Sequence, residues 1–100
     1  MGDKYGTCSL ASMGEGIDST YINLPKCQEA FIERAAQFRK PLVGIHFSGR
    51  PISSDVADKN LSAILEAWAP AEAGAKAIVD ILYGVVSPSG KLPVSVAVNA

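Results

Sequence analysis

The residues best suited to chemistry lie in one short stretch, Ser-Met-Gly-Glu-Gly-Ile-Asp, from Ser12 to Asp18. Carboxyl groups such as that of Glu15 are common proton donors and acceptors in catalysis. The glycines on either side add no side-chain bulk and accept unusual backbone dihedrals, so they permit a close approach to another surface. An isolated Gly-Glu-Gly is nevertheless more typical of a solvated turn, so its role depends on the rest of the chain.

Other familiar motifs for cofactor binding and nucleophilic catalysis are incomplete. A dinucleotide-binding fingerprint that began at Gly14 would need a third glycine where the chain has Ser19. A phosphate loop that ended in Gly90-Lys91 would need Ser or Thr next, and Leu92 is there instead. Ser48 lacks the preceding glycine of a nucleophile elbow. We therefore predict that no cofactor is bound.

The histidine and the two cysteines offer no metal site. His46 lies inside an apolar run, which favours a structural histidine whose hydrogen bonds are satisfied in the core. Cys8 and Cys27 are 19 positions apart and form no CxxC motif, so the ligands are too few for a metal. Free buried thiols are favoured over a disulfide, which stays an alternative.

Composition excludes several classes of protein. A chain of 100 residues with 48% hydrophobic and 19% charged residues is typical of one globular domain or a piece of one. A net charge of −1 without a basic stripe argues against a nucleic-acid partner. No apolar run is long enough for a membrane span. This chain shows no signal peptide and is cytoplasmic as it stands, but the compartment of the whole protein is not assigned.

The residues after Leu24 predict a helix that begins at Pro25. Proline suits the first turn because its missing N–H has no partner there anyway. Arg39 and Lys40 suit the C-terminal end of the helix dipole, and Pro41 ends the helix. Apolar side chains recur at helical spacing at Cys27, Phe31, Ile32, Ala35 and Phe38.

The rest of the chain alternates strands and a helix. Residues 42–47 are a near-continuous apolar run, which is typical of a parallel strand buried on both faces. After a polar stretch interpreted as irregular, residues 63–68 form a second predicted strand. Residues 72–83 have amphipathic spacing, with Gly84 as the C-terminal cap. Alternation over residues 92–98 predicts a final strand.

These elements predict an α/β fold, a three-layer α/β sandwich with a mostly parallel sheet. The strands at 42–47 and 63–68 are expected at its centre, with the two helices packed on the sheet. Because two helices cannot cover both faces of a parallel sheet, we expect an incomplete domain. The apolar surface that is left uncovered predicts a homodimer or marginal stability.

Three segments in this order resemble one known family. They are the Gly-Glu-Gly stretch followed by Leu24-Pro25, the segment Ser48–Pro51, and the long block from Ala63 to Val94. Over residues 12–98 they resemble the C-terminal α/β sandwich domain of glycoside hydrolase family 3, which includes β-glucosidases and β-xylosidases. The resemblance implies that residues 1–100 are a fragment, the later half of that domain.

The resemblance also implies an activity, the hydrolysis of O-glycosidic bonds by a retaining mechanism. It assigns the acid/base role to Glu15, and it places the nucleophilic aspartate on a separate barrel domain that this chain lacks. The implied partners are that barrel and a β-linked glycoside substrate. Asp18 is interpreted as a loop-stabilising acceptor and Arg50 as a structural residue. The isolated chain is expected to be inactive.

Two departures from the family pattern keep an alternative open. Family members usually carry arginine where this chain has Ser19, and a Gly-Gln-Glu-Gly-Gly run where it has Ala71–Ala75. These changes are compatible with a non-catalytic interaction or binding module derived from the same fold.

Overall fold

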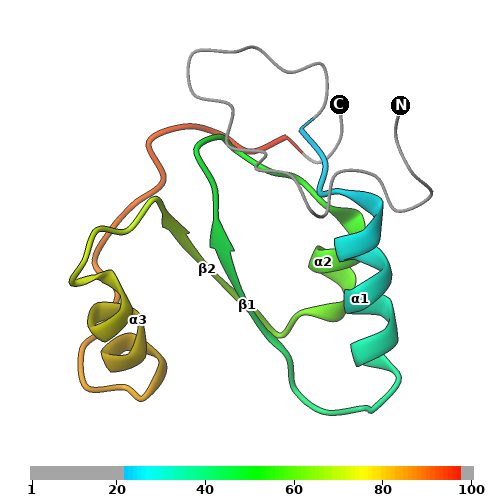
Figure 1. Ribbon diagram of the computed structural model, residues 1–100, viewed down its shortest axis with the longest axis horizontal. Helices are drawn as coiled ribbons and strands as arrows, with labels where there is room; N and C mark the ends of the chain where they lie inside the picture. Colours follow the sequence, from blue (N-terminus) through cyan, green and yellow to red (C-terminus); the bar gives the residue numbers. More distant parts are fainter. Residues whose placement is uncertain (1–21, 98–100) are drawn as a thin grey trace.

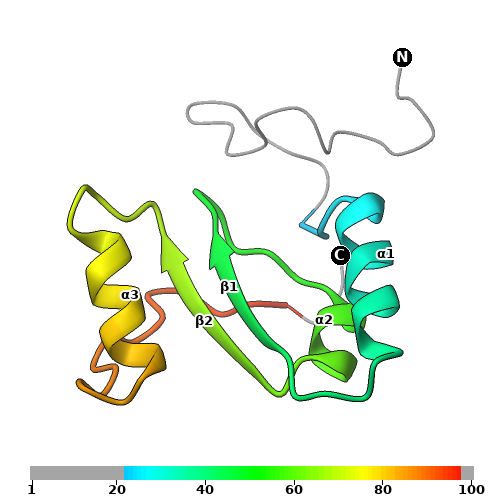
Figure 2. The same ribbon diagram turned by 60° about the horizontal axis from the view of Figure 1, so that its bottom comes forward.

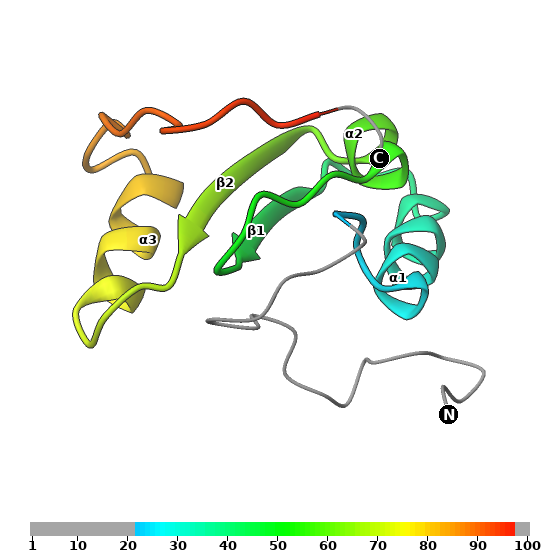
Figure 3. The same cartoon turned by 90° about the horizontal axis from the view of Figure 1, so that it is seen from above.

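The computed structural model describes residues 22–97 as a parallel strand pair with helices on two sides (Figure 1). The helices α1 and α2 lie beside β1, and α3 lies beyond β2 on the opposite side, as the view in Figure 3 also shows. This is the α/β arrangement expected from the sequence, in an incomplete domain. The elements, in chain order, are α1 (Lys26–Ala36), β1 (Val43–Phe47), α2 (Asp55–Asn60), β2 (Ala63–Trp68) and α3 (Gly74–Leu82).

Helix α1 begins where the sequence predicts it. Pro25 is the N-cap residue, and its carbonyl oxygen accepts hydrogen bonds from the backbone N–H groups of Gln28 (2.9 Å) and Glu29 (3.2 Å). The helix ends at Ala36, earlier than the basic residues had indicated. Arg39 has a φ of 54°, and a residue in this left-handed region does not continue a right-handed helix.

The two strands pair in parallel, as predicted. The register joins Val43 to Ala63 at one end and His46 to Glu66 near the other. An irregularity after His46 then pairs Phe47 with Trp68, and Trp68 adopts a φ of 52°. The strand pair therefore ends in a bulge, and bulges of this kind re-aim the side chains at a strand end.

The expectation that these strands are central and buried is wrong for the described chain. Val43 is 54% exposed and Phe47 is 60% exposed, and each strand pairs only with the other among residues 22–97. An apolar run of this kind is typical of a strand buried on both faces of a sheet. Burial of both faces would need more strands and helices than residues 22–97 contain. The exposed apolar surface is compatible with a homodimer, which stays a prediction.

The predicted strand at 92–98 is also wrong over the residues that the structure describes. Residues 92–97 are exposed and have no strand pairing. Figures 2 and 3 show this segment running from α3 back across the strands towards α2. An alternating sequence becomes a strand only when a neighbouring strand accepts its hydrogen bonds, and neither β1 nor β2 does so here.

Helix α2 falls in a stretch that the sequence analysis interpreted as irregular. Ser54 caps it: its Oγ accepts a hydrogen bond from the Ala57 N–H (3.2 Å) and donates one to Glu29 Oε1 (2.8 Å) of α1. Asp55 and Asp58 lie in the first turn, where a negative charge interacts favourably with the helix dipole. A capping serine followed by acidic residues was the signal for this helix.

We predict that Ser54→Ala destabilises the chain by about 1 kcal/mol or more, because it removes both the cap and the bond to Glu29. The midpoint of thermal unfolding, followed by circular dichroism, should fall. Ser54→Thr keeps the hydroxyl and should restore most of both bonds, and Ser62→Ala, at an exposed serine outside any helix, is the control. Equal midpoints for Ser54→Ala and Ser62→Ala would show that the cap contributes nothing.

Helix α3 agrees with the predicted amphipathic segment. It begins slightly later than predicted, because the Gly74 N–H first closes a turn onto the Ala71 carbonyl oxygen (2.8 Å). Gly84 follows the helix with a φ of 75°, as expected for a glycine cap. On the helix surface, Lys76 Nζ pairs with Asp80 Oδ2 at 2.7 Å.

We predict that Gly74→Ala destabilises the chain, because an added Cβ would overlap the Cβ of Pro70, a ring that cannot swing away. Overpacking of this kind typically costs about 1–3 kcal/mol. Gly90→Ala is the matched control, since a Cβ there meets nothing within 4 Å. Urea unfolding of both variants measures the difference, and a Gly74→Ala midpoint at or above that of the original chain would contradict the prediction.

Candidate functional site

The predicted acid/base residue Glu15 lies outside the described residues, as do Asp18 and Ser19. The structure nevertheless defines where the chain that follows them is anchored. Ser53 forms an isolated parallel bridge with Asn23: its N–H donates to the Ile22 carbonyl oxygen (2.7 Å), and its own carbonyl oxygen accepts from the Leu24 N–H (3.3 Å). The chain is therefore fixed at Ile22, seven residues after Glu15.

This anchor lies at the end of the molecule to which the strands point. Helix α1 runs back along β1, so its first turn lies towards the carboxyl end of that strand (Figure 2). In α/β sheets, ligands bind in the crevice outside the carboxyl ends of the strands. The chain that precedes Ile22, which includes Glu15 in the sequence, therefore joins the described fold at this end.

A group of residues joined by side-chain and backbone hydrogen bonds, here called the strand-end cluster, occupies the same end. At its centre, the Glu66 carboxylate accepts a hydrogen bond from the Trp68 N–H (3.1 Å) and lies 3.5 Å from Nδ1 of His46. The side chains of His46 and Glu66 are only 15% and 18% exposed. The cluster consists of His46, Ser48, Arg50, Glu66 and Trp68.

Ser48 ties the cluster to the following turn. Its backbone N–H donates to the Trp68 carbonyl oxygen (3.1 Å), which joins the two strand ends. Its Oγ donates to the Arg50 carbonyl oxygen (2.6 Å) and accepts from the Arg50 N–H (3.0 Å). The serine is 4% exposed and serves the turn, in keeping with its lack of a nucleophile elbow. A structural role for the Arg50 guanidinium stays a prediction.

The sequence pattern does not single out Glu66, and the prediction for His46 is only half right. The two residues are register partners on neighbouring parallel strands, and a long-range pairing of this kind cannot be seen in either strand alone. Nδ1 of His46 faces Glu66, but Nε2 is buried and has no hydrogen-bond partner among the described residues. The expectation of a fully satisfied histidine is therefore wrong for the described chain.

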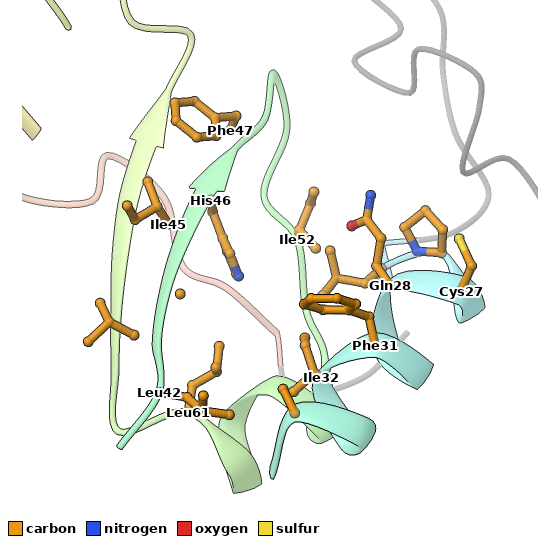
Figure 4. A pocket seen from close by; sticks show the side chains of 15 residues that line it. Cys27, Gln28, Phe31, Ile32, Leu42, Ile45, His46, Phe47, Ile52 and Leu61 are labelled. Carbon is orange, nitrogen blue, oxygen red and sulfur yellow. The ribbon is translucent and has the colours of Figure 1, made fainter. Parts of the chain in front are cut away.

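A groove of about 710 Å³ lies between α1 and β1. Figure 4 shows Phe31 and Ile32 of α1 facing Leu42 and Leu61 across it, with the His46 ring on the strand side. Its lining is mostly apolar and contains no carboxylate from the described chain. Glycoside hydrolysis needs carboxyl groups, so these residues do not make the groove a hydrolytic site.

The interpretation of Cys27 as a free thiol is wrong, because Cys27 is disulfide-bonded. The residue is the second of α1, and Figure 4 shows its sulfur at the outer end of the first turn, away from β1. Cys8 lies outside the described residues. The sequence spacing left the disulfide open as an alternative, and only the structure distinguishes the two states of Cys27.

No helix within residues 22–97 has the length and apolarity that a bilayer crossing requires. Over the same residues, no three His, Cys, Asp or Glu side chains gather in a way that suits a metal ion.

Comparison with known proteins identifies the family. The profile of the Glycosyl hydrolase family 3 C-terminal domain matches residues 3–100. The chain belongs to this family. The match includes Glu15 and every element described above, so the resemblance drawn from the sequence motifs is confirmed.

Curated relatives of this family 3 chain are glycoside hydrolases. It is 40% identical over 81 residues to a "Periplasmic beta-glucosidase" of Salmonella typhimurium, covering 81% of this chain and 11% of the relative. It is 35% identical over 81 residues to a "Xylan 1,4-beta-xylosidase" of Xylanibacter ruminicola, covering 81% and 9%. A "Thermostable beta-glucosidase B" of Acetivibrio thermocellus is 36% identical over 78 residues, with 78% and 10% covered.

The chain thus spans about a tenth of the length of these relatives. No solved structure matches it significantly.

Proposed function

We propose that this chain is part of a retaining glycoside hydrolase of the β-glucosidase or β-xylosidase type, and that it supplies the acid/base residue Glu15. The observation that carries the proposal is the Gly14-Glu15-Gly16 sequence within a chain of this family. The printed names of the relatives support the substrate class, since they include a beta-glucosidase and a xylan 1,4-beta-xylosidase.

In the proposed mechanism, two carboxyl groups flank the glycosidic bond. Glu15 donates a proton to the leaving oxygen while an aspartate on the barrel domain attacks the sugar and forms a covalent glycosyl intermediate. Glu15, now ionised, then removes a proton from water as that water attacks the intermediate. Retaining enzymes hold the two carboxyl groups about 5–5.5 Å apart, which allows direct attack by the second.

The described residues support this role through position. The bridge between Asn23 and Ser53 anchors the chain after the Gly-Glu-Gly segment, and the bond from Ser54 to Glu29 joins α1 to α2 beside that anchor. The flanking glycines, Gly14 and Gly16, add no side-chain bulk and so permit close approach to a second domain. The implied partners are therefore the barrel domain and a β-linked glycoside.

The test is the stereochemistry of hydrolysis by the complete protein that joins this chain to its barrel. Proton NMR during hydrolysis of an aryl β-glucoside or β-xyloside should show the β-anomer of the sugar first, with the α-anomer growing only by mutarotation. The α-anomer as the first product would contradict the retaining mechanism. Absence of hydrolysis of either substrate would favour the alternative, a non-catalytic binding module, to which Ser19 and Ala71–Ala75 point.

A further inference from the structure

The disulfide at Cys27 constrains the segment of chain that contains its partner. Cys27 is disulfide-bonded, and the chain contains one other cysteine, Cys8. The Gly-Glu-Gly segment lies between these two positions in the sequence. A bond between them would close a ring with Glu15 inside it.

The Cys27 side of this ring is a fixed point. Cys27 is half-buried in the first turn of α1, whose backbone bonds to Pro25 begin the helix. Just before that turn, the bridge between Asn23 and Ser53 holds the chain to the residues that follow β1. A covalent bond to Cys27 therefore ties its partner to the anchored chain that follows the Glu15 segment in the sequence.

A disulfide would limit the backbone freedom of the segment that contains Glu15. Gly14 and Gly16 permit many backbone conformations, and this freedom opposes the positioning that proton transfer requires. Closing both ends of a flexible segment reduces the number of conformations open to it. Resting on the proposed function, we propose that Cys8 and Cys27 form a disulfide that positions Glu15 for its acid/base role.

The bond forms by exchange with a disulfide donor such as oxidised glutathione. The Cys27 thiolate attacks the donor and one glutathione thiolate leaves, and the Cys8 thiolate then displaces the second glutathione from the Cys27 sulfur. The two cysteines lose two protons and two electrons in total, and the donor takes them up as two glutathione thiols. Such bonds persist in oxidising compartments and are lost under cytosolic reduction.

The bond can be tested without any activity. Trypsin cleaves after Lys4, Lys26 and Arg34, so it separates the peptide with Cys8 (residues 5–26) from the peptide with Cys27 (residues 27–34). In the unreduced complete protein, mass spectrometry should find these two peptides joined, and reduction should release them. A Cys27 peptide joined to another copy of itself, or to a peptide from elsewhere in the protein, would overturn the proposal.

The positioning role is tested with two leaving groups in the complete protein. A 4-methoxyphenolate leaves slowly without a proton, whereas a 2,4-dinitrophenolate leaves readily without one. Cys8→Ser should therefore lower kcat/KM for the 4-methoxyphenyl glycoside about tenfold, and for the 2,4-dinitrophenyl glycoside less than twofold. Cys27→Ser and the double variant should give the same values, because each breaks the same bond.

A structural role alone predicts a different result. Loss of folded protein lowers kcat/KM for both substrates by the same factor, and this outcome would overturn the positioning role. Glu15→Gln separates the two proposals. If Glu15→Gln changes the ratio between the substrates and Cys8→Ser does not, only the disulfide proposal fails. If Glu15→Gln leaves the ratio unchanged, the acid/base assignment itself fails, whatever the peptide map shows.

Discussion

Replacing Glu15 by alanine in the complete protein is expected to lower turnover of a glycoside with a poor leaving group by about 10²–10⁴-fold, the usual contribution of general acid–base catalysis. The alkoxide or weakly acidic phenolate must then leave without a proton. The nucleophile and the sugar pocket lie on the barrel in this proposal, so substrate binding should change far less than kcat. Steady-state kinetics with a 4-methoxyphenyl glycoside measure the loss.

Azide distinguishes a lost acid/base from general damage. With a 2,4-dinitrophenyl glycoside, the glycosyl intermediate still forms, and its hydrolysis becomes slow because no base activates the water. Azide needs no base, so it should restore turnover and yield a glycosyl azide of retained configuration. Glu33→Ala, at an exposed glutamate of α1, is the matched control and should leave kcat unchanged. Unchanged turnover in Glu15→Ala would remove the acid/base assignment.

The second large effect is expected from the chain alone, which should hydrolyse no glycoside. Covalent catalysis needs the nucleophile and the proton donor on opposite sides of one bond. Acid assistance alone is worth about 10²–10⁴-fold. Without the barrel, the substrate is also not aligned, and alignment can contribute about 7–11 kcal/mol.

The described acidic side chains offer no second catalytic group. Glu66 is engaged with His46 and the Trp68 N–H, and Asp80 pairs with Lys76. Asp55 and Asp58 lie in the first turn of α2, and Glu29 accepts a hydrogen bond from Ser54. The remaining two, Glu33 and Glu72, are exposed.

Purified chain should therefore give no more product from aryl β-glucosides and β-xylosides than Glu15→Gln does. Turnover clearly above background that Glu15→Gln abolishes would show that the nucleophile lies within these 100 residues. The complete protein, assayed with the same substrates, is the positive control.

Local sequence determined the elements whose signals are short-range. Pro25 and the apolar spacing after it define the start and the face of α1, and Gly84 ends the amphipathic segment that becomes α3. The patterns at 42–47 and 63–68 predicted the parallel strands, which are confirmed, although the burial on both faces that an apolar run usually reflects is not found among residues 22–97. Motif order was sufficient for the family, since the matched profile covers the same residues.

Tertiary structure decided the features that depend on distant partners. Glu66 faces His46 only because of the register between the two strands. Cys27 is disulfide-bonded, which its spacing from Cys8 in the sequence does not predict. Helix α2 had a local cap signal, but the same serine also bonds to Glu29 of α1, a contact made across the fold. Residues 92–97 have the alternation of a strand and no neighbour to pair with. Propensity is a property of neighbouring residues, whereas strand pairing, burial and disulfides are free-energy gains shared between segments, so they depend on which segments the fold brings together.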